Sequence, residues 1–168
     1  MIDKFLSREH KQKNIGRYYP SEIGNCLRKQ WYTYKFPQEI SPDLLKVFEL
    51  GNILHNFVVE VLESDKNSDV ELLKSEFPLK LERKEYIISG RIDNLILIKS
   101  NNEEVLVEVK SMRNVNFLEE PQQHHIMQLQ FYMFAMGVHK GILLYIDRDK
   151  LQSKIFNIPY DEMYNIKT

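Results

Sequence analysis

The chain has 168 residues, 43% hydrophobic and 28% charged, with a formal net charge of −1. This length suits one globular domain over residues 1 to 168, and the nearly neutral charge argues against a sequence-independent coat for nucleic acid. The sequence contains a single cysteine, Cys26, which excludes an internal disulfide framework. It contains no apolar run long enough to cross a bilayer, so we expect a cytoplasmic protein without membrane segments.

Residues 15 to 36 combine basic and aromatic side chains, among them Arg28, Lys29, Trp31 and Tyr32. Aromatic rings stack on bases and cations bind phosphates, so this composition suits a single strand of nucleic acid. The alternative is an amphipathic helix whose aromatic side chains belong to the core, and for Trp31 and Tyr32 the two interpretations have roughly equal support. Arg28 and Lys29 are the better candidates for contacts with DNA.

Residues 41 to 63 are predicted to form a helix, with Ser41 as N-cap and Pro42 in the first turn. The apolar stripe of this helix consists of Leu44, Val47, Phe48, Leu54, Val58, Val61 and Leu62. His55 falls on or beside the stripe, so it faces the body of the protein, and Gly51 permits close packing there. By burial preference alone, a lone inward histidine is ordinarily a structural core residue.

A polar loop at residues 64 to 69 precedes a predicted strand at residues 71 to 81, which we expect to be the first strand of the sheet. Glu76 in this strand is a candidate for an outer carboxylate of a metal site. The favoured interpretation is a charge that solvates an edge strand.

Residues 90 to 110 contain two strongly apolar strands that also carry charges. The polar turn at residues 100 to 104 predicts a hairpin, which would bring Asp93 of the first strand beside Glu108 of the second. Glu108 and Lys110 are two residues apart in a strand and therefore share a face. Adjacent carboxylates repel, and burying them without partners is costly, so this arrangement needs compensation. A divalent metal would supply it.

These residue types suit phosphodiester hydrolysis. Carboxylate oxygens hold Mg²⁺ or Mn²⁺, the metal lowers the pKa of a bound water, and the ammonium of Lys110 offsets charge that develops on phosphate. For a single Glu-x-Lys pattern, the favoured alternative is a salt-bridged pair at the end of a sheet. Asp93 and the upstream Gly90 make that alternative weaker here.

Pro121 begins a second predicted helix, which Gly137 ends. Gln128 and Tyr132 are four residues apart, so they share a helix face from which an amide and a phenol can bind phosphate and a catalytic water. Without further context, the composition of this helix indicates a core helix of methionines and aromatics. Two more predicted strands follow, over residues 141 to 146 and 153 to 158.

Five short patterns occur in a fixed order: Cys26-x-Arg28, Gly51 to His55, Gly90 to Asp93, Glu108-x-Lys110 and Gln128 to Tyr132. In this ordered combination the chain resembles the CRISPR-associated RecB-like exonucleases of the PD-(D/E)XK nuclease superfamily, over residues 20 to 158. The resemblance implies a restriction-endonuclease-like α/β fold, with a central mixed sheet, helices on both sides and the metal site at one sheet edge.

The resemblance also implies individual roles. Asp93, Glu108 and Lys110 would be catalytic, with Gln128 and Tyr132 in support. The implied metal ligands are His55, Asp93, Glu108 and the main-chain carbonyl of Val109. A histidine nitrogen among the ligands shifts the preference from Mg²⁺ toward Mn²⁺.

The function expected from the resemblance is a DNA exonuclease dependent on Mn²⁺ or Mg²⁺. It would act on single-stranded or frayed ends and process DNA for CRISPR spacer acquisition, together with integration proteins. The alternative is a catalytically weak module that binds DNA ends within an integration or repair complex.

In many relatives the cysteine at the position of Cys26 helps to hold an iron–sulfur cluster, together with cysteines that follow the nuclease core. No cysteine follows Cys26 in these 168 residues, so we expect no such cluster from this chain and an inert, buried thiol. A compact member without the cluster and a truncated reading frame are both compatible with this pattern.

Overall fold

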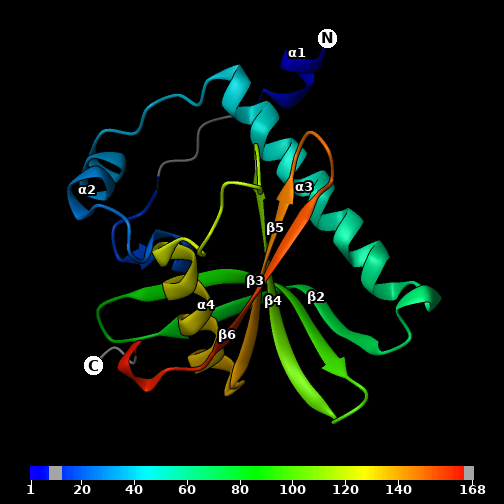
Figure 1. Cartoon of the computed structure of the whole chain (residues 1–168). Helices are drawn as coiled ribbons and strands as arrows, with labels where there is room; N and C mark the ends of the chain where they lie inside the picture. Colours follow the sequence, from blue (N-terminus) through cyan, green and yellow to red (C-terminus); the bar gives the residue numbers. More distant parts are fainter. Residues whose placement is uncertain (8–12, 165–168) are drawn as a thin grey trace.

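A computed structural model describes residues 1–7 and 13–164 (Figure 1). The helices are α1 (Ile2–Leu6), α2 (Leu27–Lys35), α3 (Pro42–Glu63) and α4 (Gln123–Met136). The short 3₁₀ turns are η1 (Pro20–Glu22), η2 (Asp65–Asn67) and η3 (Glu162–Tyr164). The strands are β1 (Arg17–Tyr18), β2 (Val70–Glu82), β3 (Ile87–Ile98), β4 (Glu103–Met112), β5 (Lys140–Asp147) and β6 (Ser153–Pro159).

The strands form one mixed sheet in the order β1, β3, β4, β5, β6, and β2 also pairs with β3. The pairs β1 with β3 and β4 with β5 are parallel, whereas the remaining pairs are antiparallel. The expected mixed α/β fold is therefore confirmed, although the two-residue strand β1 was not anticipated from the sequence.

Helices cover both faces of the sheet (Figure 1). On one face, Leu129 of α4 is buried against strand residues such as Leu106 and Leu143. On the other face, Leu54 and Val58 of α3 are buried with Val105, Val107 and Val109 of β4. Ser41 caps α3, because its side chain accepts a hydrogen bond from the backbone N–H of Leu44, as predicted.

The sheet is split near its centre. β2 pairs along one edge of β3 from residue 87 to residue 98, so β1 and β4 must share the other edge. The pairing of β3 with β4 ends at Asn94 and Val107, and Asp93 and Glu108 are the next residues on the two strands. The candidate metal site therefore lies where these two neighbouring strands part, within the sheet rather than at one sheet edge.

Gly90 allows η1 and α4 to pack closely against β3 beside the split. A Cβ atom at this position would lie 2.9 Å from Cδ of Pro20 in η1 and 2.9 Å from the hydroxyl of Tyr132 in α4. The Tyr132 hydroxyl donates a hydrogen bond to the carbonyl of Arg91, at 3.0 Å, in the segment of β3 that β4 has left. A glycine is needed here because neighbouring elements approach the β3 backbone closely.

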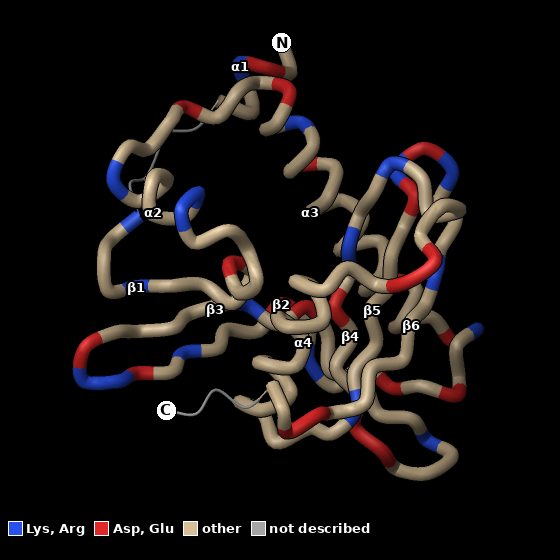
Figure 2. Tube along the Cα trace, turned by 60° about the vertical axis from the view of Figure 1, so that its left-hand side comes forward, with Lys and Arg blue, Asp and Glu red and all other residues tan. Residues whose placement is uncertain are grey.

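Helices α1 and α2 and the first turns of α3 form an arc that stands away from the sheet, as both views show (Figures 1 and 2). We call this part of the chain the N-terminal arc. Tyr34 anchors α2, because this residue is buried and its hydroxyl lies within hydrogen-bond distance of two acceptors, Glu22 Oε2 at 2.8 Å and the Arg17 carbonyl at 3.0 Å. The apolar stripe of α3 is therefore only partly covered, and Leu44, Val47 and Phe48 remain exposed. None of the described helices has the length and apolar character needed to cross a membrane.

Candidate active site

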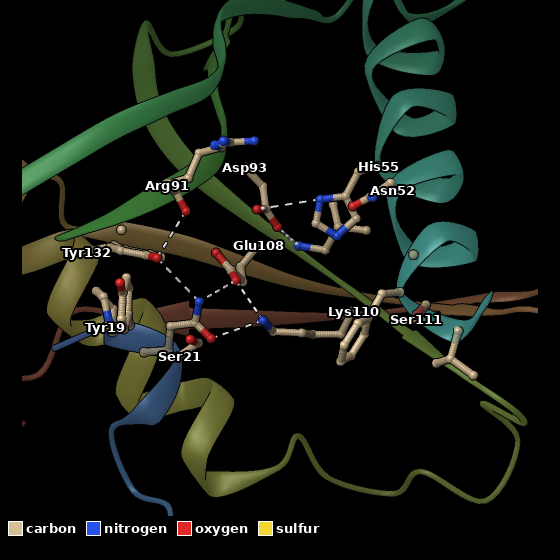
Figure 3. Close-up of a pocket in the computed structure, with 17 residues that line it drawn as sticks. Tyr19, Ser21, Asn52, His55, Arg91, Asp93, Glu108, Lys110, Ser111 and Tyr132 are labelled. Atoms are coloured by element: carbon tan, nitrogen blue, oxygen red, sulfur yellow. Dashed lines mark hydrogen bonds and ion pairs between the residues drawn. The ribbon is translucent and has the colours of Figure 1, made fainter. Parts of the chain in front are cut away.

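A pocket of ≈ 630 Å³ opens at the split in the sheet (Figure 3). It is lined by parts of η1, α3, β3, β4 and α4, so helices from both faces of the sheet reach it. Its volume lies within the range of pockets that hold small organic ligands, which is of the order of a few hundred Å³.

Asp93 and Glu108 form the floor of this pocket, with exposed fractions of only 7% and 2%. Asp93 Oδ2 accepts a hydrogen bond of 2.8 Å from the backbone N–H of Val109. This bond takes the place of the next rung of the β3–β4 ladder. The hairpin thus places the two carboxyl groups at opposing positions on the two strands, as the sequence predicted.

Glu108 is held by two donors that share one of its oxygens. Lys110 Nζ and Gln128 Nε2 both lie 2.7 Å from Glu108 Oε1. Lys110 Nζ also donates to Gln128 Oε1 at 3.0 Å, so the three side chains form a closed triangle. Gln128 therefore fixes the relative position of the carboxylate and the ammonium group. Figure 3 shows the side chains of Glu108 and Lys110 pointing toward each other.

The second oxygen of Glu108 has no such support. Among the described residues, Glu108 Oε2 and Asn94 Oδ1 are the buried side-chain atoms without a hydrogen-bond partner. A buried, unpaired carboxylate oxygen is costly, because the group loses water without gaining another partner. Glu108 Oε2 is thus available to an additional cationic partner.

The surroundings of the two carboxyl groups make them reluctant to ionise. Burial raises the pKa of Asp93 to about 7, although Lys110 and the Val109 N–H oppose the shift. Burial, followed by the charge of Asp93, raises the pKa of Glu108 to about 7. For Lys110, burial lowers the pKa, but the charges of Glu108 and Asp93 outweigh it and raise the pKa overall. A bound cation would favour the ionised form of both carboxyl groups.

α3 contributes His55 on the other side of the pocket. His55 Nδ1 lies 3.6 Å from Asp93 Oδ1 and 3.2 Å from Oε1 of Glu76 in β2. Arg91 Nη1 lies 3.1 Å from Glu76 Oε2. The sequence placed His55 facing the body of the protein, as observed. It favoured a solvating charge on an edge strand for Glu76, and the one-third exposed carboxylate of Glu76 contacts His55 and Arg91.

The arrangement fits a divalent cation. His55, Glu76 and Asp93 each offer one ligand atom, and these atoms lie within 4.8 Å of one another. Glu108 adds the unpartnered oxygen, and Val109 also lines the pocket. Oxygen ligands with one imidazole nitrogen are a suitable donor set for Mg²⁺ or Mn²⁺.

The structure does not bring Arg28 and Lys29 to the pocket. Both are exposed on α2, and no α2 residue lines the pocket. Trp31 and Tyr32 are exposed by 53% and 47%, so they do not belong to the core. Cys26, at the N-cap of α2, is exposed as well, and the expectation of a buried thiol was wrong.

No family model matches the sequence. A curated relative, the CRISPR-associated exonuclease Cas4 of Saccharolobus solfataricus, is 30% identical over 169 residues, which cover 96% of this chain and 82% of the relative. The crystal structure of SSO0001 matches with a TM-score of 0.64 and 29% identity, over 96% of this chain and 76% of that chain. The alkaline exonuclease LHK-Exo from Laribacter hongkongensis has the same fold, with a TM-score of 0.57 and 14% identity over 89% of this chain and 80% of its own.

The curated relative matches most of both chains, and the crystal structure of SSO0001 shares the fold over 96% of this chain. The chain therefore belongs to the family of the CRISPR-associated exonuclease Cas4, within the RecB-like branch of the PD-(D/E)XK nucleases.

Proposed function

We propose that this protein is a metal-dependent DNA exonuclease that hydrolyses phosphodiester bonds at single-stranded or frayed ends. The observation that carries the proposal is the split in the sheet. There, two buried carboxyl groups and a lysine ammonium converge, and one carboxylate oxygen has no partner. Buried charges contribute little to folding stability, because their desolvation is unfavourable, and a cluster of them in a pocket therefore indicates a ligand-binding site.

His55, Asp93, Glu108 and the main-chain carbonyl of Val109 are proposed to hold the cation. When bound, a divalent cation polarises a phosphoryl oxygen and lowers the pKa of a water molecule. The histidine nitrogen favours Mn²⁺ over Mg²⁺, so activity should be well supported by Mn²⁺.

The residues of the chain supply position and charge. Lys110 stays protonated near neutral pH, because Glu108 and Asp93 hold its pKa above the usual value. Its ammonium, fixed by Glu108 and Gln128, is proposed to donate to an oxygen of the scissile phosphate and to stabilise the charge that develops there. Tyr132 supports the position of Gln128, because the Tyr132 hydroxyl donates to the Arg91 carbonyl and lies 3.4 Å from Gln128 Nε2.

The preference for single strands rests on α2. Trp31, Tyr32 and Phe36 form an exposed cluster of aromatic rings, with centroids 5.0 to 6.0 Å apart. Arg28 and Lys29 are exposed on the same helix, whose basic positions are visible in Figure 2. Exposed rings beside cations can stack on unpaired bases while the cations bind phosphates, whereas paired bases offer no such faces.

The relative with the same family assignment is named as CRISPR-associated. We therefore propose that the protein trims DNA for spacer acquisition together with integration proteins. The intact triangle of Glu108, Lys110 and Gln128 favours an active enzyme over a module that only binds DNA ends.

The test is the release of labelled nucleotides from single-stranded DNA in Mn²⁺, with Lys110→Ala compared with wild type. We expect the turnover of Lys110→Ala to fall by about a thousandfold, since one preorganised charge of this kind is worth roughly that factor. DNA binding should change little. The control is Lys140→Ala, which removes an exposed lysine paired with Glu103 at the far end of β5. Near-normal turnover of Lys110→Ala would refute the proposed chemistry.

A further inference from the structure

Glu76 has an unusual backbone conformation for a strand residue. Its φ is 48°, although regular pairing of β2 with β3 continues on both sides, at Ser75 with Asn94 and at Phe77 with Ile92. The other described non-glycine residues with positive φ, Asn102 and Leu151, lie in the connections between strands. A left-handed conformation is unfavourable for a glutamate within a strand and persists only where the surrounding structure enforces it.

The contacts of Glu76 as they stand do not offset this cost. Its side chain is one-third exposed and pairs with His55 on one oxygen and with the exposed guanidinium of Arg91 on the other. Contacts between charged side chains of this exposure contribute little to stability, because solvent screens them. The strained backbone nevertheless turns the carboxylate of Glu76 toward His55 and Asp93, which indicates a functional reason for the strain.

The spacing of the three side chains matches ligands around one ion. His55 Nδ1 lies 3.2 Å from Glu76 Oε1 and 3.6 Å from Asp93 Oδ1. Neighbouring ligand atoms of an octahedral ion with bonds of about 2.1 Å lie about 3 Å apart. A second observation concerns the pocket that His55 and Asp93 line, because the buried Oε2 of Glu108 in this pocket has no hydrogen-bond partner.

We propose that Glu76, which the sequence offered only as a candidate outer carboxylate, is a further ligand of the divalent metal beside His55, Asp93 and Glu108. The assignment rests on the proposed function, since it concerns the same site. It adds a third carboxylate to the proposed metal centre, and the affinity for a cation increases with the number of charged ligands. It also explains why β2, which contributes no residue to the Asp93–Glu108 hairpin, has an irregular residue at this point.

The test measures Mn²⁺ binding to the full chain by calorimetry, after metal removal with EDTA, for two variants. Glu76→Gln keeps the length of the side chain and removes its charge, whereas Glu76→Asn also relieves strain, because asparagine tolerates the left-handed conformation. We expect at least a tenfold loss of Mn²⁺ affinity in both variants. Glu71→Gln, an exposed residue of the same strand, is the matched control and should bind Mn²⁺ like wild type.

A second readout separates ligation from a structural role. In EDTA the melting temperature of Glu76→Asn should be unchanged or higher, because strain and repulsion from Asp93 are both reduced. A structural residue would instead lower the melting temperature and leave the Mn²⁺ affinity unchanged, and this result would overturn the assignment.

Asp93→Asn distinguishes the failure of this inference from failure of the metal centre. If Asp93→Asn loses Mn²⁺ binding while both Glu76 variants bind like wild type, Glu76 is not a ligand and the metal centre stands. If Asp93→Asn also binds like wild type, the metal centre itself is refuted.

Discussion

The split in the sheet and the N-terminal arc differ in the type and the burial of the side chains that they carry. At the split, Asp93, Glu108 and Lys110 are fixed by backbone and side-chain hydrogen bonds and are held by strands whose own side chains form the core. Along the arc, α2 is held chiefly through Tyr34 and exposes the rings of Trp31 and Tyr32. One region is buried and charged, and the other is exposed and aromatic.

This difference suits the split to catalysis and the arc to the binding of DNA. Charges that act on a reacting phosphate must be preorganised, which requires burial and a hydrogen-bond network. A surface that accepts many base sequences gains from exposed rings, because stacking does not depend on the identity of the base. Substitutions in the two regions should therefore affect different measurements.

The largest effect in this comparison is expected for His55→Ala. Removal of a ligand should weaken Mn²⁺ binding by about 10- to 100-fold, in line with the effect of changes around metal sites. The melting temperature in EDTA should change little, because His55 is partly exposed and lies outside the buried cluster of α3. The control is His139→Ala, which changes an exposed histidine directly before β5. An unchanged Mn²⁺ affinity of His55→Ala would show that His55 is a packing residue and not a ligand.

A smaller effect is expected for Tyr32→Ala on the arc. Loss of one stacking ring should weaken the binding of single-stranded DNA by about tenfold, since stacking contributes about 1–3 kcal/mol per base. Mn²⁺ affinity should stay at the wild-type value. Phe134→Ala on α4 is the matched control, because both side chains are 47% exposed. If the two variants lose equal DNA affinity, α2 is not the binding surface.

The ease of prediction from sequence also differs between the two regions. The Asp93–Glu108 hairpin and the cap of α3 were predicted, because each depends on residues close in the chain. Gly90 was recognised as part of a motif, but its reason, the close approach of Pro20 and Tyr132, depends on elements distant in sequence.

The sequence raised Glu76 and the aromatic residues of α2 as candidates, but local pattern could not decide their roles. The direction of the Glu76 side chain depends on a positive φ and on where α3 packs, and a glutamate in a strand gives no signal of either. Aromatic side chains such as those of Trp31 and Tyr32 are also common in core helices. They are exposed here because α2 lies away from the sheet (Figure 1).

The smallest expected effect is a pH dependence of stability at the split. Asp93 has its pKa raised from 3.8 to about 7, and Glu108 from 4.5 to about 7. Between these values the folded protein binds more protons than the unfolded chain, so the stability from these groups is present at low pH and is lost as pH rises through about 7. In EDTA, the fall in melting temperature from pH 5 to pH 8 should be smaller in Asp93→Asn than in wild type. An equal fall in both proteins would contradict the raised pKa of Asp93.

The most direct test of the metal site is anomalous diffraction at the manganese edge from crystals soaked in Mn²⁺, with Asp93→Asn crystals as control. We expect an anomalous peak in the pocket at the split, within bonding distance of His55, Asp93 and Glu108, and its loss in the control. A peak elsewhere, or an empty pocket at a Mn²⁺ concentration that supports cleavage of DNA, would contradict the assignment of the split as the catalytic metal centre.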